Sequence, residues 1–216
     1  MTTTQAVSGH LDDPGPGLHP ILARRWSPRG FSLQHRCSDA DLSNLLEAAR
    51  WSPSHNNSQP WRFIVGRRGD PVFGGLLECL AKGNQRWAAA ASALVCGLAV
   101  LYDDTGAEQP WARYDLGQAI AYMTVQAGAD GLHSRQMAGF DAQALRCSFG
   151  VGPGYEPCIV AAFGVLGGPH EVPAAIRARD DAARERAPAE DLVYQAGGAE
   201  FAWCRPDLLR TDGSDG

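Results

Sequence analysis

Lysine is almost absent from this chain: Lys82 is the only one among 216 residues, and arginine supplies nearly all of the positive charge. No basic stripe offsets the formal net charge of -5, which argues against a nucleic-acid-binding protein. No apolar run approaches the length of a membrane-spanning helix, so no membrane partner is expected. The first residues lack the basic and apolar regions of a signal peptide, and the cytoplasm is therefore the expected location.

Metal and nucleophile motifs are also missing. The six cysteines form no CxxC pair, and neither they nor the six histidines follow a metal-binding spacing, so no metal site is expected. The chain has no P-loop, no GxGxxG after a strand and no GxSxG elbow. A cysteine–histidine nucleophile would have to be assembled from scattered residues such as Cys37 and His55, which makes it a minor alternative.

The composition is that of a globular protein, with 44% hydrophobic and 20% charged residues. Residues 1–17 are rich in Thr, Gly and Pro and are predicted to be a disordered tail. No linker or repeat divides the remainder, so residues 18–216 are predicted to form a single α+β domain, with helices interleaved among a few hydrophobic strands.

Local patterns place the elements of this domain. Helical periodicity and capping residues predict helices from Leu18 to Ala23, over 39–50 after an N-cap at Ser38, from Asp70-Pro71 to a stop at Gly83, over 111–131 and, after Asp141, over 142–149. Short apolar runs predict strands over 61–65, 92–101, 133–137 and 157–166.

Three polar clusters are candidates for function. The loop WSPSHNNSQPW, residues 51–61, places many hydrogen-bonding side chains between two tryptophans, as a planar polar ligand would need; the alternative is a capped surface loop with Asx-type turns. Residues 24–29 present three arginines and a serine on one turn, which suits an anion; the alternative is a solvated basic turn. A second arginine cluster covers residues 177–186.

Together these clusters indicate an anionic ligand with a flat polar part. Flavin mononucleotide (FMN) would fit, with its phosphate at the arginines and its ring at the amide-rich loop, but other nucleotides would fit as well. The residue chemistry alone does not choose between them.

Longer motifs carry a resemblance to a known family. Arg25–Arg29 is similar to an R-x-S-x-[KR] phosphate motif, Ser52–Trp61 to an S-P-S-x-x-N-x-Q-P-W loop, and Met137–Asp141 to an x-x-G-F-D turn. Tyr114–Gly117 and the spacing Arg184-x-Arg186-x-Pro188 also fit. In this order the motifs resemble the FMN-dependent nitroreductase family from about Leu22 to Leu192.

The resemblance implies a nitroreductase-like fold, with a central, mainly antiparallel sheet flanked by helices. It also implies a homodimer with FMN at the subunit interface, in which a domain-swapped C-terminal arm from about residue 170 wraps the partner. Arginines near both ends would bind the phosphate and the nearby ring edge, and Pro53, Ser54 and His55 would reach the flavin of the other subunit. Asn84 would bind the ring, and the 138–139 backbone would approach N5. The implied cofactor-binding residues are Arg25, Trp26, Ser27, Arg29, Pro53, Ser54, His55, Asn57, Asn84, Ala138, Gly139, Arg184 and Arg186.

The implied activity is that of an FMN-dependent oxidoreductase. NADH or NADPH would reduce the flavin, and a small electron-poor acceptor such as a nitroaromatic or a quinone would then reoxidise it in a ping-pong cycle. Arg29 is the candidate catalytic residue, because its charge would stabilise the reduced ring near N1 and O2. The alternatives are other flavin chemistry (dehalogenation, enone reduction or O2-dependent oxidation) and a non-catalytic FMN-binding protein.

The chain departs from the family pattern in three places. Trp87 stands where many relatives have a lysine, and Ala138 where some have a glutamate. The connection 103–110 is short, and Trp111 after it lies either at the pocket mouth or in the packing of a helix start.

Overall fold

The computed structural model of this protein describes residues 17–193. In that range the chain forms two compact units, one of residues 24–180 and one of residues 17–23 with 181–193. No helix of the described part is both long and apolar enough to cross a membrane. The elements in chain order are α1 Pro20–Arg24, α2 Asp39–Arg50, η1 His55–Asn57, β1 Trp61–Arg67, α3 Pro71–Cys79, α4 Lys82–Ala88, β2 Ala93–Val100, α5 Ala112–Ala129, β3 His133–Met137, α6 Ala142–Phe149, β4 Tyr155–Gly164, α7 Ala174–Asp180 and η2 Ala189–Leu192.

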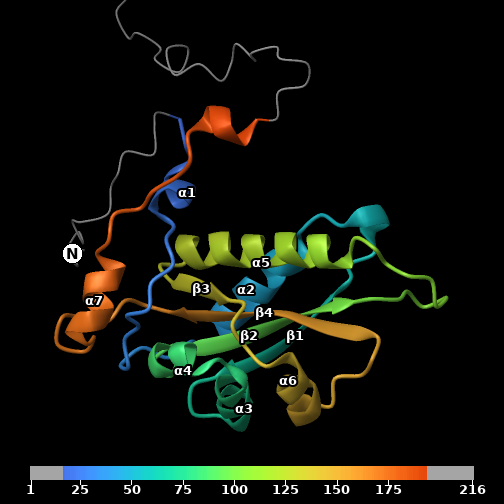
Figure 1. Ribbon diagram of the computed structural model, residues 1–216, viewed down its shortest axis with the longest axis horizontal. Coiled ribbons are helices and arrows are strands. Elements are labelled where there is room, and N and C mark those ends of the chain that lie inside the picture. Colours follow the sequence, from blue (N-terminus) through green and yellow to red (C-terminus); the bar gives the residue numbers. More distant parts are fainter. Residues whose placement is uncertain (1–16, 194–216) are drawn as a thin grey trace, which may run out of the picture. The chain divides into compact units, whose positions relative to one another are not determined.

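The larger unit is built on an antiparallel sheet. Within the described residues its strands follow the order β1-β2-β4-β3 (Figure 1). Cys96 of β2 lies opposite Ile64 of β1 and Val160 of β4, and Val160 in turn lies opposite Met137 of β3. The residues from Ala93 to Ala99 are all buried, which explains why this apolar run takes a central place in the sheet.

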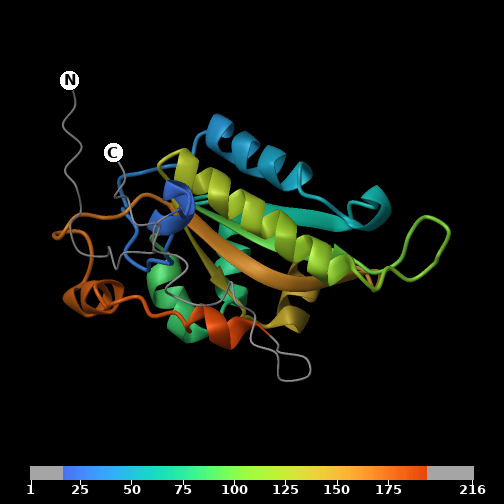
Figure 2. The ribbon, with the colours of Figure 1, turned by 90° about the horizontal axis from the view of Figure 1, so that it is seen from above.

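Each face of the sheet carries its own hydrophobic core. Helices α2 and α5 cover one face, and α3, α4 and α6 cover the other (Figures 1 and 2). Side chains alternate along β2, so that Val95 belongs to the core under α5 while Leu94 and Cys96 belong to the core with α3. The prediction of an α+β fold with an antiparallel sheet flanked by helices is therefore confirmed.

Several element boundaries agree with the sequence. The predicted helices over 39–50 and 142–149 and the strand over 133–137 have the observed bounds. Ser38 and Asp41 form a reciprocal capping box at the start of α2, and the Asp141 side chain accepts the Ala144 N–H at the start of α6. These elements are specified by local chemistry.

The predicted helix end at Gly83 is wrong. Helix α3 ends at Cys79, and a separate helix α4 begins at Lys82, so Gly83 is helical. Between them Leu80 forms an antiparallel bridge with Phe140, and the Ala81 N–H donates to the Gly139 carbonyl at 2.9 Å. This pairing draws two residues out of the helix and brings α4 beside residues 138–140.

In the smaller unit the two ends of the described chain meet. Arg184 Nη1 donates to the Ala23 carbonyl oxygen at 2.9 Å. Helix α1 corresponds to the helix predicted over 18–23. The predicted disordered tail lies, up to residue 16, outside the described residues, as does the predicted C-terminal arm from residue 194 onward.

Candidate functional site

A buried carboxylate holds the arginine-rich segment that follows α1. The backbone N–H groups of Arg29 and Gly30 donate to the side chain of Asp180, at 2.8 Å and 2.7 Å to Oδ2. Asp180 is the last residue of α7 and is buried. Pro28 has no N–H, so Arg29 and Gly30 carry the first two backbone donors after it, and both donate to Asp180. These charge-assisted hydrogen bonds fix the backbone from which the Arg29 side chain extends.

Three predicted residues precede this anchor on the same segment. Arg25 Nη1 donates to Ser27 Oγ at 3.2 Å. The Trp26 ring meets the His133 ring edge-on, with centroids 6.2 Å apart and planes at 76°. The segment therefore lies against β3, and the structure brings the predicted residues Arg25, Trp26, Ser27 and Arg29 together.

A residue absent from the predicted set joins this cluster. Arg135 of β3 donates to the Ser27 carbonyl oxygen, and its guanidinium lies 5.6 Å from the centroid of the Trp87 ring. Burial lowers the pKa of Arg135, and the positive charge of Arg29 lowers it further. Two guanidinium groups thus share one corner of the unit, where they repel each other.

Helix α4 connects this corner to the 138–139 turn. Asn84 Nδ2 donates to the Gly139 carbonyl oxygen at 3.1 Å. Trp87 follows one turn later on the same side of the helix and stacks on Phe31, with centroids 6.2 Å apart. A Cβ on Gly139 would lie 3.1 Å from Asn84 Nδ2, so the glycine permits this close approach. The predicted residues Asn84, Ala138 and Gly139 are therefore also brought together, and Ala138 and Gly139 are exposed.

The 51–61 loop has a different anchor. Asp115 of α5 is 2% exposed, and its Oδ2 accepts the His55 N–H at 3.0 Å. Inside the loop, Ser54 Oγ accepts the Gln59 N–H at 3.0 Å and the Ser54 carbonyl accepts the Asn57 N–H at 3.1 Å. Buried and local hydrogen bonds therefore give this polar loop a defined conformation.

The backbone of the loop has unusual angles. Asn56, Asn57 and Gln59 have φ of 50°, 57° and 48°, in the left-handed region that non-glycine residues seldom enter. Asparagine tolerates this region, whereas Gln59 has no such preference and is held by its bond to Ser54. Such conformations occur mainly where the surrounding structure enforces them, often at functional sites.

The predicted loop residues border a cavity at the start of α5. Pro53, Ser54 and His55 line it together with Trp111 and Tyr114, and its volume is about 270 Å³. The aromatic rings of Trp111 and Tyr114 are 54% and 66% exposed, and the His55 and Trp111 ring centroids lie 6.3 Å apart. Trp111 therefore lines this cavity beside His55.

The two groups of predicted residues lie at opposite ends of the larger unit. In both views η1, drawn in teal, lies at the right-hand end of α5, whereas α4 and β3 lie toward the other side (Figures 1 and 2). One chain therefore does not bring Ser54 and His55 to the cluster of Arg29, Asn84 and Gly139. Arg184 and Arg186 belong to the smaller unit, and their grouping with Arg25 and Arg29 stays a prediction.

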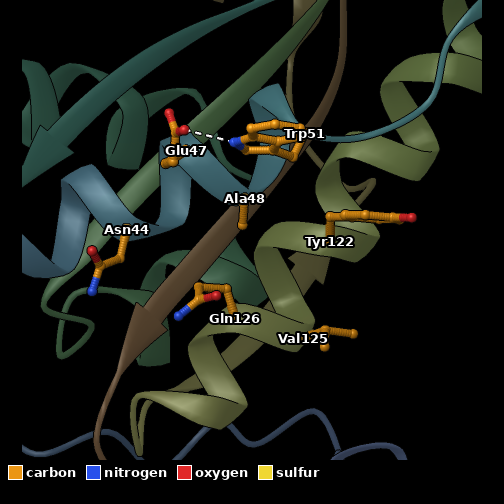
Figure 3. A pocket seen from close by; sticks show the side chains of 7 residues that line it. All are labelled: Asn44, Glu47, Ala48, Trp51, Tyr122, Val125 and Gln126. Atoms are coloured by element: carbon orange, nitrogen blue, oxygen red, sulfur yellow. Dashed lines mark hydrogen bonds between the residues drawn. The ribbon is translucent and has the colours of Figure 1, made fainter.

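A larger groove runs between α2 and α5 and reaches the start of the 51–61 loop at Trp51. It has a volume of about 470 Å³ and is lined by Asn44, Glu47, Ala48, Trp51, Tyr122, Val125 and Gln126 (Figure 3). Trp51 is 71% exposed, and its Nε1–H donates to Glu47 Oε1 at 2.7 Å. The first tryptophan of the 51–61 loop thus extends an apolar surface along α5.

Sequence reasoning missed three residues that shape these sites. Asp180 and Arg135 contact Arg29 and Ser27 across 151 and 108 residues, and no local signal identifies such pairs. Asp115 lay inside a recognised motif, but its bond to His55 spans 60 residues. A charged residue within a short strand, as Arg135 is, was the one available hint.

The chain is similar to known proteins in both sequence and fold. The sequence model described as the Nitroreductase family matches residues 22–72. A 15.4 kDa protein of Mycolicibacterium smegmatis is 40% identical over 144 residues, which span 62% of this chain and 94% of that protein. The major NAD(P)H-flavin oxidoreductase of Aliivibrio fischeri is 46% identical over 50 residues, which span 22% of this chain and 23% of that protein.

The fold agrees with these sequence matches. A crystal structure described as an oxidoreductase containing FMN has a TM-score of 0.78 and 25% identity, and the match covers 93% of this chain and 100% of that one. The family match includes the arginine segment and the 51–61 loop, and the structural match extends to nearly the whole chain. The chain belongs to the nitroreductase family.

Proposed function

We propose that this protein is an FMN-dependent oxidoreductase that takes electrons from NADH or NADPH and passes them to a small electron-poor acceptor such as a nitroaromatic or a quinone. The observation that carries the proposal is a chain of contacts: Arg135, beside Arg29, donates to the Ser27 carbonyl oxygen and lies over Trp87 of α4, the helix on which Asn84 holds the exposed 138–139 turn. A flavin site needs a cation, a hydrogen-bonding amide and accessible backbone. Here they come from three segments that are far apart in sequence.

The residues of this cluster fit an anionic flavin. Among the side chains that the structure describes, those of residues 17–188 and 191–193, no carboxylate forms an ion pair with the guanidinium of Arg29 or of Arg135. The nearby carboxylate of Asp180 is occupied by backbone N–H groups. The guanidinium groups of Arg29 and Arg135 therefore carry positive charge that no described carboxylate pairs with, which favours a phosphate or a ring that becomes negative on reduction.

The chain contributes position and charge to the reaction. When bound, FMN supplies the hydride chemistry. Asp180 fixes the backbone at Arg29, so that this guanidinium is presented at a constant place. Asn84 holds the Gly139 carbonyl and thereby fixes the turn that approaches the ring. Arg29 then stabilises the negative charge that accompanies reduction, because charge placed in advance costs no reorganisation.

A second copy of the chain completes the site in this proposal. The loop around η1 is held by Asp115 and exposes most of its residues, yet it lies at the far end of the unit from α4 and β3 (Figures 1 and 2). A two-fold symmetric dimer would bring the loop of one subunit to the cluster of the other and form two equal sites. The exposed rings of Trp51, Trp111 and Tyr114 and the groove along α5 provide apolar surface for that contact.

The relatives support the same function. One similar structure is described as an oxidoreductase containing FMN, and one similar sequence as a NAD(P)H-flavin oxidoreductase. We extend both properties to this chain, with the arm from about residue 170 contacting the partner subunit. Residues 170–180 of that arm also pack on their own chain, where the Asp180 side chain accepts the Arg29 N–H.

The test is anaerobic rapid mixing of the FMN-loaded protein with NADH and, separately, with NADPH. The oxidised flavin absorbance should bleach with at least one donor and return when a nitroaromatic or a quinone is added. A protein that does not bind FMN contradicts the proposal, and so does a bound flavin that neither donor reduces. Bleaching without reoxidation by either acceptor would indicate the other flavin chemistries.

A further inference from the structure

The side chain of Arg135 leaves its own strand, β3, and binds another segment of the chain. It lies on β3, where the neighbouring residues Ser134 and Met137 are buried in the sheet, yet its guanidinium reaches the Ser27 carbonyl on a different segment. This hydrogen-bond partner, Ser27, lies 108 residues earlier in the sequence. The side chain is thus held at the arginine-rich corner by a specific hydrogen bond.

The Trp87 ring supports the guanidinium from α4. The ring is buried, and the distance from Arg135 Cζ to its centroid is 5.6 Å. Arginine stacks well on an aromatic face because its charge is delocalised over a plane. Trp87 itself stacks on Phe31, so the support is rigid. One turn before it on α4, Asn84 binds the Gly139 carbonyl.

The charges at this corner are not balanced by the described protein groups. Burial and the positive charge of Arg29 hold the pKa of Arg135 below its usual range. Asp180 attracts Arg135 but forms its hydrogen bonds with the backbone of Arg29 and Gly30. Two partly buried like charges are costly unless an anion joins them.

We propose that Arg135 is a second cation of the flavin site, which acts with Arg29 on the negative charge that FMN acquires when it is reduced. The inference rests on the proposed function and assigns to Arg135 a role that the family motifs in this sequence did not indicate. Arg135 is a cofactor-binding residue that favours the reduced state, and Trp87 is the positioning residue that aims it.

The test compares Arg135→Gln, Arg135→Lys and the wild type by two measurements on purified FMN-loaded protein. Fluorescence titration gives the Kd of oxidised FMN, and anaerobic equilibration with a reference dye gives the midpoint potential. In Arg135→Gln the affinity for reduced FMN should fall about tenfold more than the affinity for oxidised FMN, which lowers the potential of a two-electron couple by about 30 mV. Arg135→Lys keeps the charge and should restore most of that difference.

Arg67→Gln is the matched control, because Arg67 pairs with Asp39 on the exposed edge strand β1 and its loss changes the net charge equally. Its potential should equal that of the wild type. If Arg135→Gln fails to fold, Arg135→Met keeps the apolar stem over Trp87 and gives the same comparison.

Two results would overturn the inference. One is an unchanged potential in the neutral variants, and the other is an equal loss of affinity for both oxidation states, which would place the charge on the phosphate alone. A merely structural role would lower thermal stability in the neutral variants without moving the potential. If the wild type binds FMN and cycles it while Arg135→Gln has an unchanged midpoint potential, only this inference is contradicted. If the wild type binds no FMN, the proposed function itself is contradicted.

Discussion

Arg29 is positioned by a carboxylate 151 residues further along the chain. Asp180 accepts its backbone N–H, so the side chain starts from a fixed point while its guanidinium keeps its own hydrogen-bonding groups. The division is physically sensible, because a carboxylate paired directly with the guanidinium would neutralise the charge that a bound anion needs. At the scale of single residues, charge and anchoring are thus assigned to different atoms of Arg29.

Arg29→Gln should weaken FMN binding and lower the flavin potential, because the variant removes a positive charge while preserving the backbone bonds to Asp180. The loss is expected to be about tenfold to a hundredfold in affinity for the reduced cofactor, the range for one charge-assisted hydrogen bond. Equilibrium titration of both oxidation states measures it. An unchanged potential would remove Arg29 from its assigned role.

His133 gives a prediction about pH. Its Nδ1 is buried without a hydrogen-bond partner among the described residues, and burial lowers its pKa from the usual 6.5. As the pH falls below that value the unfolded chain takes up a proton that the folded protein refuses, so stability decreases with acidification. His133→Phe keeps an aromatic ring beside Trp26 and should lose this part of the pH dependence.

Urea midpoints at about pH 7 and about pH 5 for the two proteins provide the measurement, since both values lie on either side of the ordinary histidine pKa. The difference between the two midpoints should be smaller in His133→Phe. The exposed His170→Asn serves as the control and should behave as the wild type. An identical pH dependence in all three proteins would contradict the buried, uncharged state of His133.

At the scale of secondary-structure elements, β1 and α3 pack so closely that a side chain is excluded between them. A Cβ on Gly66 of β1 would lie 2.4 Å from the backbone nitrogen of Phe73 and 2.6 Å from its Cα. Both atoms belong to the first turns of α3, which cannot move without shifting the helix. The glycine therefore sets the distance between this strand and its helix.

Gly66→Ala should destabilise the protein by about 3 kcal/mol, the upper range for overpacking against an unyielding backbone. Gly74→Ala is a matched control in α3, where nothing lies within 4 Å of the new Cβ, and it should stabilise the helix by about 0.5–1 kcal/mol. Chemical denaturation of the two variants gives both values. Equal stabilities would show that α3 adjusts more freely than the packing indicates.

At the scale of the whole molecule, each chain carries two incomplete halves of the proposed site. The Arg29 cluster and the 51–61 loop belong to the same compact unit but lie at its opposite ends (Figures 1 and 2). If a dimer joins them, every site uses one half from each subunit. A substitution in one chain then affects only the site to which that chain contributes the substituted half.

Complementation tests this arrangement. Two inactive proteins are co-expressed with different affinity tags: Arg29→Gln, and a loop variant in which Ser54, His55 and Asn57 are all alanine. In the mixed dimer one site collects both defects and the other collects none, so a random mixture should recover about a quarter of the wild-type sites. Doubly tagged dimers isolated by two affinity steps should be about half active per dimer.

The readout is flavin reduction by the nicotinamide that reduces the wild type. A mixture of two preparations of the same variant is the control and should stay inactive. Mixed dimers without recovered activity would mean that each site is built within one chain, which would contradict the dimer proposal while leaving FMN binding untouched.

The sequence by itself determined the elements whose causes are local. The Ser38–Asp41 box, the Asp141 cap and the apolar run over 92–101 act through neighbours a few residues away, and they predicted α2, α6 and β2 to within a residue or two. Residue motifs also placed the arginine segment and the amide-rich loop in the correct family. Interactions between residues that are close in sequence can be predicted from the order of the residues.

Only the tertiary structure decided which distant groups meet. The end of α3 at Cys79 depends on the pairing of Leu80 with Phe140, and the places of Arg29 and Arg135 depend on Asp180, Ser27 and Trp87. These contacts join residues 48 to 151 positions apart, and a residue's own neighbours carry no information about them. The physical reason is that a buried charge or an unpaired backbone group accepts any suitable partner, and the fold alone selects which one is near.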